Sequence, residues 1–95
     1  MKYVIEHPLE VSCTPESLHR QEARLPKDPQ VRLYHTFVSL THRRAIRLFE
    51  APDRVRLINY LDANDLPYDR VWTIELEMED ARVVTAGEPA VAGAP

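Results

Sequence analysis

The sequence predicts an α+β domain whose elements follow the order β-α-β-β-α-β. Three patterns carry this prediction: two segments with helix-cap signals, a pair of apolar runs joined by a short polar turn, and one strictly alternating run. With 95 residues, a net charge of -3 and 44% hydrophobic residues, the chain has the composition of one ordinary globular domain. A chain of this length builds only a thin core, so contact with a second copy would add to its stability.

The N-terminal third is expected to hold one strand and one helix. Residues 2–6, KYVIE, are β-branched and aromatic at their centre, which favours a strand. Thr14 is a good helix-capping residue, and Pro15 costs nothing at the first helical position. Pro26 ends the segment, so we expect a helix over residues 15–25. Its apolar stripe is thin, which is typical of a helix that covers a sheet.

Two neighbouring strands and a second helix follow. Residues 31–40 and 44–50 are apolar-rich and are separated by three polar residues, which predicts an antiparallel hairpin. Asp53 is a strong N-cap, and apolar residues at helical spacing continue until the chain nears Asn64. The second helix is therefore expected between these two residues.

The last predicted strand is RVWTIELEME, residues 70–79, which alternates cleanly between apolar and polar side chains. We expect Trp72 and Ile74 on its buried side and the other side in water. From residue 81 the chain mixes small residues, Gly and Pro without a period, so no secondary structure is assigned there. The prediction is a domain at residues 1–80 and a flexible C-terminal tail at residues 81–95.

This element order is that of the ferredoxin-like sandwich, a four-stranded antiparallel sheet with both helices on one face. In the two central runs both alternating sets of side chains are apolar or aromatic, so both faces of the sheet are predicted to be buried. Two helices cover only one face. We therefore expect a homodimer that forms through the other face.

Several segments resemble a bacterial family of small ferredoxin-like domains of unknown function, one member of which is described as a nickel-binding protein. The resemblance rests on the opening MKYVIEH, on HTFVS, on FEAP and on its spacing to LPYDRVWTIE, and it covers roughly residues 1–78. It implies a dimeric ferredoxin-like fold and metal binding. His35 matches the family's strand-two histidine, Glu50 stands just before its Ala-Pro pair, and Tyr60 takes the place of a histidine that the family usually carries.

His35 is the principal candidate for a functional site, because it lies between two aromatic residues in VRLYHTFVSL. An imidazole can serve as a metal ligand, as a general base or as an anchor for a ligand. Glu50 would be its carboxylate partner, and together they form the predicted site for a divalent metal such as nickel. Tyr60 and His7 complete the predicted ligand-binding set. Each residue also has a plainer alternative. His35 would only satisfy the hydrogen bonds of its neighbours, and Glu50 would be solvated. Tyr60 would pack on the sheet, and His7 would cap a strand end.

Three functions remain open from the sequence. The first is a dimeric binding protein for a metal ion or small ligand around His35. The second is a cofactor-free oxygenase or isomerase of the dimeric barrel type, with His35 as general base, which would require an enclosed apolar pocket of a few hundred Å³. The third is a dimerisation module without a site, in which His35 would be packed and hydrogen-bonded to the backbone.

Other functions lack support in the composition. The acidic charge balance and a third strand, RAIRLFE, without the glycine and aromatic pattern of RNA-binding domains argue against nucleic acid. A cluster of basic residues is expected to form a solvated edge: His42, Arg43, Arg44, Arg47, Arg54 and Arg56. No segment has the apolar core of a signal peptide or the length of a membrane span, so we expect a cytoplasmic protein without a membrane partner. The single cysteine, Cys13, excludes an intrachain disulfide and is expected to act as a small apolar residue.

Overall fold

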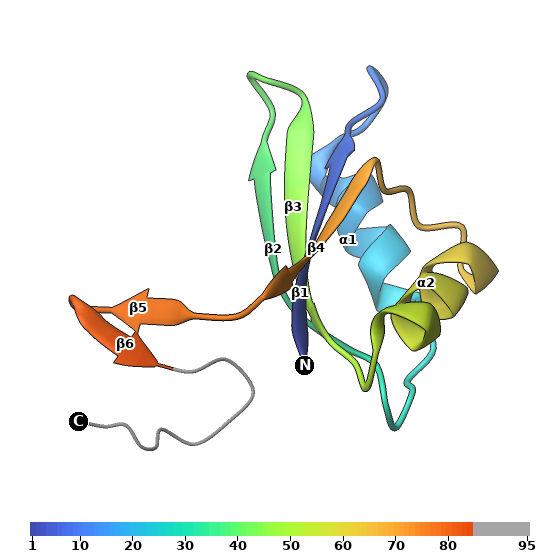
Figure 1. The fold of residues 1–95 in the computed structure, drawn as a ribbon. Coiled ribbons are helices and arrows are strands. Elements are labelled where there is room, and N and C mark those ends of the chain that lie inside the picture. The colour runs from blue at the N-terminus through green and yellow to red at the C-terminus, as the bar shows by residue number, and fades with distance from the viewer. Residues whose placement is uncertain (85–95) are drawn as a thin grey trace.

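The computed structural model describes residues 1–84 and shows an α+β fold with a four-stranded antiparallel sheet and two helices (Figure 1). Its elements are β1 (Lys2–Pro8), α1 (Pro15–Ala23), β2 (Arg32–Ser39), β3 (Arg44–Glu50), α2 (Arg54–Ala63), β4 (Arg70–Ile74), β5 (Glu77–Glu79) and β6 (Arg82–Val84). The strands of the main sheet lie in the order β2-β3-β1-β4. The predicted sheet and both helices are confirmed, and the arrangement is compatible with a ferredoxin-like domain.

Both helices begin where the capping residues predict. The Thr14 side chain accepts a hydrogen bond from the backbone N–H of Ser17, and the Ser17 hydroxyl accepts one from the backbone N–H of Thr14. Asp53 accepts a bond from a backbone N–H in the first turn of α2. These bonds satisfy donors that a helix leaves free at its start. Helix α2 ends before Asn64 as predicted, whereas α1 ends at Ala23, two residues earlier than expected.

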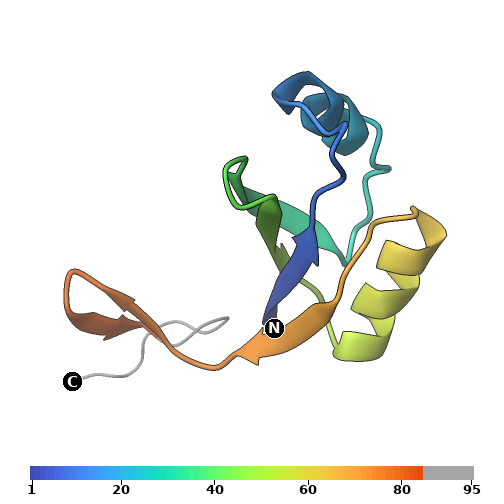
Figure 2. The ribbon, with the colours of Figure 1, turned by 90° about the horizontal axis from the view of Figure 1, so that it is seen from above.

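The hydrophobic core lies between the sheet and α2. Both helices lie on the same side of the sheet (Figure 2), but they contribute differently to the core. The core cluster consists of Tyr3, Ile5, Val31, Phe49, Ala51, Leu57, Tyr60, Leu61 and Leu66. No residue of α1 is fully buried. Helix α2 is therefore anchored by apolar packing, whereas α1 lies over a part of the sheet that carries polar side chains.

The C-terminal part of the described chain differs from the prediction. The expected strand over residues 70–79 is interrupted after Ile74, and its second half forms a separate hairpin, β5 with β6. Asp80 and Ala81 both have positive φ, 53° and 65°, which is the backbone of a two-residue turn of the tightest hairpin type. Assigning no structure from residue 81 was thus wrong for β6. The hairpin extends away from the main sheet on the side opposite the helices (Figures 1 and 2). The rest of the predicted tail lies outside the described residues.

Candidate functional site

The position of His35 depends on an irregularity in β2. Leu33 pairs with Phe49 and His35 pairs with Leu48, so one extra residue, Tyr34, lies between two successive cross-strand pairs. A bulge of this kind shifts the alternation of a strand by one residue. His35 therefore lies on the side of the sheet opposite the core residue Phe49, on the face that the helices leave uncovered.

We call this uncovered side of the main sheet the open face. Cross-strand pairing orders its residues into rows that run across the strands in the order β2, β3, β1, β4. The central row is His35, Leu48, Val4 and Trp72; the row on one side of it is Arg32, Glu50, Lys2 and Ile74; the row on the other side is Phe37, Ile46, Glu6 and Arg70. The open face thus has an apolar centre with charged residues of both signs around it.

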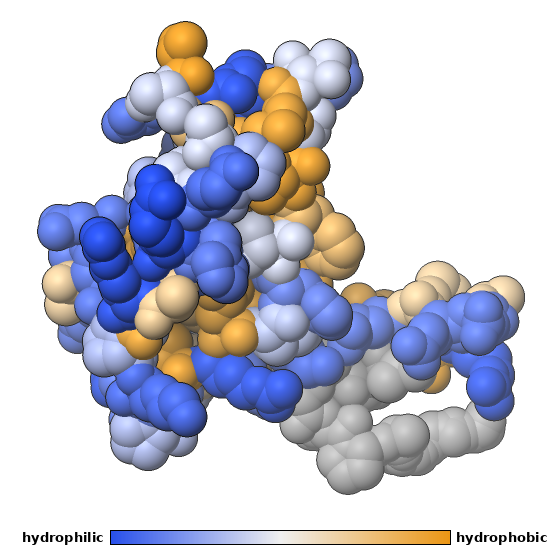
Figure 3. All heavy atoms as spheres, turned by 180° about the vertical axis from the view of Figure 1, so that it is seen from behind, coloured by the Kyte–Doolittle hydropathy of each residue, from blue (hydrophilic) through white to orange (hydrophobic). Residues whose placement is uncertain are grey.

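The open face exposes large hydrophobic side chains. Phe37 is 57% exposed, Trp72 53% and Ile46 36%. The prediction that Trp72 lies on the buried side of its strand is wrong for a single subunit. Its neighbours Val71 and Thr73 pair with Ile5 and Tyr3 and take the core side instead. Seen from behind, most of the surface is hydrophilic, and apolar side chains gather in a strip that runs from the top of the molecule to its middle (Figure 3). A grouped apolar surface of this kind marks an interaction site.

His35 lies exposed at the β2 end of the central row. Its ring centroid lies 5.4 Å from that of Tyr34 and 5.8 Å from that of Phe37. Neither ring nitrogen forms a hydrogen bond with the described residues. His35 is therefore not the packed, backbone-bonded histidine expected of a module without a site, and its nitrogens are accessible.

Glu50 shares the open face with His35, in the adjacent row opposite Lys2. The Lys2 ammonium donates to Glu77 at 3.0 Å, and this bond raises the pKa of Lys2. It also lies 5.4 Å from the ring centroid of Tyr34. Burial raises the pKa of Tyr34, whose hydroxyl is enclosed without a partner among the described residues. Glu50 forms no salt bridge within residues 1–84, so its carboxylate is available.

Tyr60 and His7 lie on the other side of the sheet, away from His35 and Glu50. Tyr60 is buried against Phe49, at 6.2 Å between ring centroids, and its hydroxyl donates to the Pro26 carbonyl oxygen at 3.0 Å. This matches the plainer alternative of a packed tyrosine. Buried His7 is only 2% exposed, and its Nδ1 lies 3.0 Å from the Pro8 carbonyl oxygen. Because a carbonyl only accepts, Nδ1 carries the proton and the buried Nε2 is an acceptor.

Arg47 is fully buried, which contradicts the prediction that it belongs to a solvated basic edge. Its Nε donates to Glu22 Oε2 at 3.1 Å and its Nη2 donates to Gln21 Oε1 at 2.9 Å. The Thr36 hydroxyl donates to the same Glu22 oxygen at 2.6 Å. These bonds join the sheet to α1. The alternation in RAIRLFE could have revealed the burial, because it sets Arg47 on the same side as the apolar residues before and after it.

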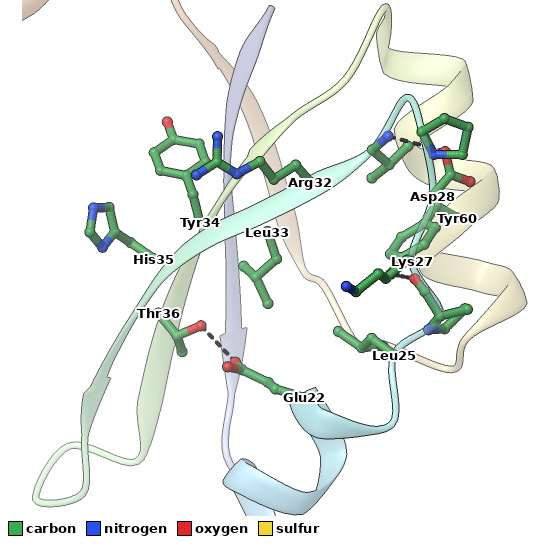
Figure 4. Close-up of a pocket in the computed structure, with 13 residues that line it drawn as sticks. Glu22, Leu25, Lys27, Asp28, Arg32, Leu33, Tyr34, His35, Thr36 and Tyr60 are labelled. Carbon is green, nitrogen blue, oxygen red and sulfur yellow. Dashed lines mark hydrogen bonds between the residues drawn. The ribbon is translucent and has the colours of Figure 1, made fainter.

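A cleft with a volume of about 790 Å³ runs beside β2 on the helix side. Leu33 and Thr36 point from β2 towards Glu22, Leu25 and Lys27, whereas Arg32, Tyr34 and His35 leave the strand on the opposite side (Figure 4). The cleft opens to solvent and carries charged side chains. It is therefore not the enclosed apolar pocket that the enzyme hypothesis requires next to His35.

The metal-binding capacity of one subunit is limited. Within residues 1–84 no three His, Cys, Asp or Glu side chains come together in a group that could hold a metal ion. His35 and Glu50 are thus two possible ligands on one face, and residues 1–84 place no third ligand beside them. No helix in this part of the chain has the length and apolar character needed to cross a membrane.

Comparisons with known proteins assign neither a family nor a function to this chain. Neither the protein-family models, nor the curated proteins, nor the solved structures include a match to this chain. The resemblance to the bacterial family with a nickel-binding member therefore stays a prediction, as does the metal site that it implies.

Proposed function

We propose that the chain is a cytoplasmic, ferredoxin-like binding protein that works as a homodimer and holds one divalent metal ion, such as nickel, between the open faces of its two subunits. The observation that supports this most strongly is the position of His35. It stands exposed at the end of an apolar row, on the same face as Glu50. Within residues 1–84 the His35 ring forms no hydrogen bond and the Glu50 carboxylate forms no salt bridge.

The proposed dimer places its two-fold axis across the strands, through the central row of the open face. Each residue of that row then meets its own copy, so the two His35 side chains face each other. The two outer rows exchange partners, which sets Glu6 of one subunit opposite Lys2 of the other and Phe37 opposite Arg32. These contacts pair opposite charges and place a cation on an aromatic ring. The same rotation sets Glu50 opposite Ile46 and Arg70 opposite Ile74. The self-complementary parts of the face are therefore its apolar central row and the two contacts named above.

The hairpin of β5 and β6 also supports association. Met78 and Val83 of the hairpin are 69% and 57% exposed, and Leu76, just before it, is 65% exposed. A two-stranded hairpin without an apolar partner is marginally stable in water. Since the hairpin extends on the open-face side (Figure 2), we assign it to packing against the second subunit.

The dimer would complete a metal site that one subunit lacks. Glu50 is two residues along β3 from Leu48, the partner of His35, and is therefore its diagonal neighbour. Such neighbours have Cα atoms about 7–8 Å apart, within reach of long side chains. Two imidazoles and two carboxylates give four ligands, and imidazole suits nickel, copper and zinc. The stoichiometry follows directly as one metal per dimer.

Native mass spectrometry of the metal-stripped full chain, titrated with nickel, zinc and copper, tests this proposal. We expect a dimer that takes up one metal ion, no uptake by His35→Ala, and weakened uptake by Glu50→Gln. His42→Ala is the matched control, because His42 is also an exposed histidine but lies in the β2–β3 turn. Uptake of metal by monomers, uptake that survives His35→Ala, or a dimer that takes up no metal would each contradict the metal site.

A further inference from the structure

The cleft on the helix side of β2 is a second site, separate from the open face. Its walls are β2, the end of α1, the connecting segment before β2, and Tyr60 of α2. A volume of about 790 Å³ is in the range of pockets that hold small molecules. His35 of the proposed metal site also lines the cleft at its β2 edge, but its side chain leaves the strand on the opposite side (Figure 4).

The charges in this cleft are unbalanced in favour of an anion. Two carboxylates line it, and each is already paired with an arginine: Glu22 with Arg47 and Asp28 with Arg56. Lys27 also lines the cleft and points into it (Figure 4), but it forms no salt bridge within residues 1–84. Arg32 also lines the cleft and forms no salt bridge within residues 1–84, but its side chain leaves β2 on the opposite side (Figure 4). Lys27 is therefore the cation that points into the cleft without a carboxylate partner in the described part of the chain.

Apolar side chains form the floor of the cleft. Leu25 and Leu33 approach it from α1's end and from β2, and they pack at the margin of the hydrophobic core. Buried Val31 and the ring of Tyr60 continue this surface. An apolar body of small size would be removed from water where it lies against this floor.

The rim that carries Lys27 is fixed in place by hydrogen bonds. Asp28 Oδ1 accepts from the backbone N–H of Gln30 at 2.8 Å and of Val31 at 3.1 Å. The Tyr60 hydroxyl bonds the Pro26 carbonyl on the other side of Lys27. The backbone around the lysine is thus preorganised, which lowers the ordering cost of binding.

From these features we propose that the cleft binds a small monocarboxylate with an apolar body. The carboxylate would pair with Lys27, and the apolar part would lie between Leu25, Leu33 and Tyr60. The site uses one subunit only, so it does not depend on the dimer or on the metal.

An NMR titration of the full chain with 3-phenylpropanoate and with its neutral analogue 3-phenylpropanamide tests this inference. Backbone ¹H–¹⁵N signals report the location, and those of Leu25, Leu33 and Thr36 should move. The acid should bind about five-fold more tightly than the amide, the advantage expected of one partly solvated ion pair. Lys27→Gln should remove that preference and leave the affinity for the amide unchanged.

Arg82→Gln is the control, because it removes an exposed cation on the distant hairpin. Equal affinity for acid and amide, or a preference for the acid that survives Lys27→Gln, would overturn the inference. So would signals that move only outside the cleft, or no saturable shift up to about 20 mM, far above the Kd of a fragment that fits such a site.

Discussion

The buried ion pair between Arg47 and Glu22 gives the sharpest prediction for the fold, because its two sides are buried unequally. The Arg47 side chain is 1% exposed, whereas that of Glu22 is 28% exposed. Glu22→Gln keeps the shape of the side chain but leaves a guanidinium charge that water cannot reach. Removing one partner of a buried pair costs about 3–5 kcal/mol, and the partial exposure of Glu22 favours the lower end.

Arg47→Met should cost much less than Glu22→Gln. Methionine fills most of the arginine volume, and the carboxylate left behind can be hydrated, so we expect a loss of about 1 kcal/mol or less. The double variant, Glu22→Gln with Arg47→Met, no longer contains the uncompensated charge. The free energy of unfolding of this variant should therefore be close to that of Arg47→Met. Such differences are large fractions of the roughly 5–15 kcal/mol that stabilise a domain of this size.

Urea unfolding at one fixed protein concentration measures these effects, provided that the slope with denaturant stays constant. Glu16→Gln is the matched control, because Glu16 is exposed on the same helix. If Glu22→Gln proves no more destabilising than Arg47→Met, the guanidinium is hydrated, and the buried position assigned to Arg47 is wrong.

Three further predictions concern His7, Asp53 and Trp72. Burial is the main cause that lowers the pKa of His7, and the charges of Arg47 and Arg44 add to it, whereas the hydrogen bond to the Pro8 carbonyl and the charge of Asp69 oppose it. The unfolded chain then binds a proton that the folded chain does not, so the free energy of unfolding should fall as the pH drops below about 6.5. Urea unfolding at pH 7.5 and 5.5 should show this fall, and His7→Phe should reduce it while His19→Ala leaves it intact. Asp53→Ala removes the cap of α2 and should cost about 1 kcal/mol in the same assay; no loss would mean that the cap bond is not made. Trp72 is the single tryptophan of the chain and is half-exposed in one subunit, so its fluorescence should shift to the red on dilution as dimers separate; emission that does not depend on concentration would place it outside an interface.

The sequence predicted correctly those helices and strands whose ends are set by residues next to them, such as helix caps and the limits of apolar runs. Strand β3 begins and ends where the apolar run does, and α2 follows its cap Asp53. The hairpin of β5 and β6 lacks such a local signal. Its turn residues Asp80 and Ala81 are not the Asn-Gly or Asp-Gly pair that is typical of two-residue hairpin turns, so the sequence did not predict it.

The faces of the sheet were harder to predict, because they depend on contacts between strands. The bulge at Tyr34 decides that His35 lies on the open face, and no pattern within β2 reveals where a strand accommodates an extra residue. The same difficulty applies to His7, which lies on the helix side of the sheet. Tyr60 was included only because the family carries a histidine there, and its place on α2 also sets it on the helix side. Arg47 is a different case. The alternation in β3 indicates that Arg47 is buried, but its charge led to the prediction that it is solvated.

The proposed dimer requires that a second copy of the chain covers the open face. Sedimentation velocity of the metal-stripped full chain over a range of concentrations tests it, with Ile46→Glu as the disrupting variant and Val55→Glu, which is on α2 and 69% exposed, as the control. We expect a species of twice the 11.0 kDa chain mass for the natural chain and the control, and 11.0 kDa for Ile46→Glu. A natural chain that stays at 11.0 kDa at every concentration, or a dimer that Ile46→Glu does not separate, would contradict it.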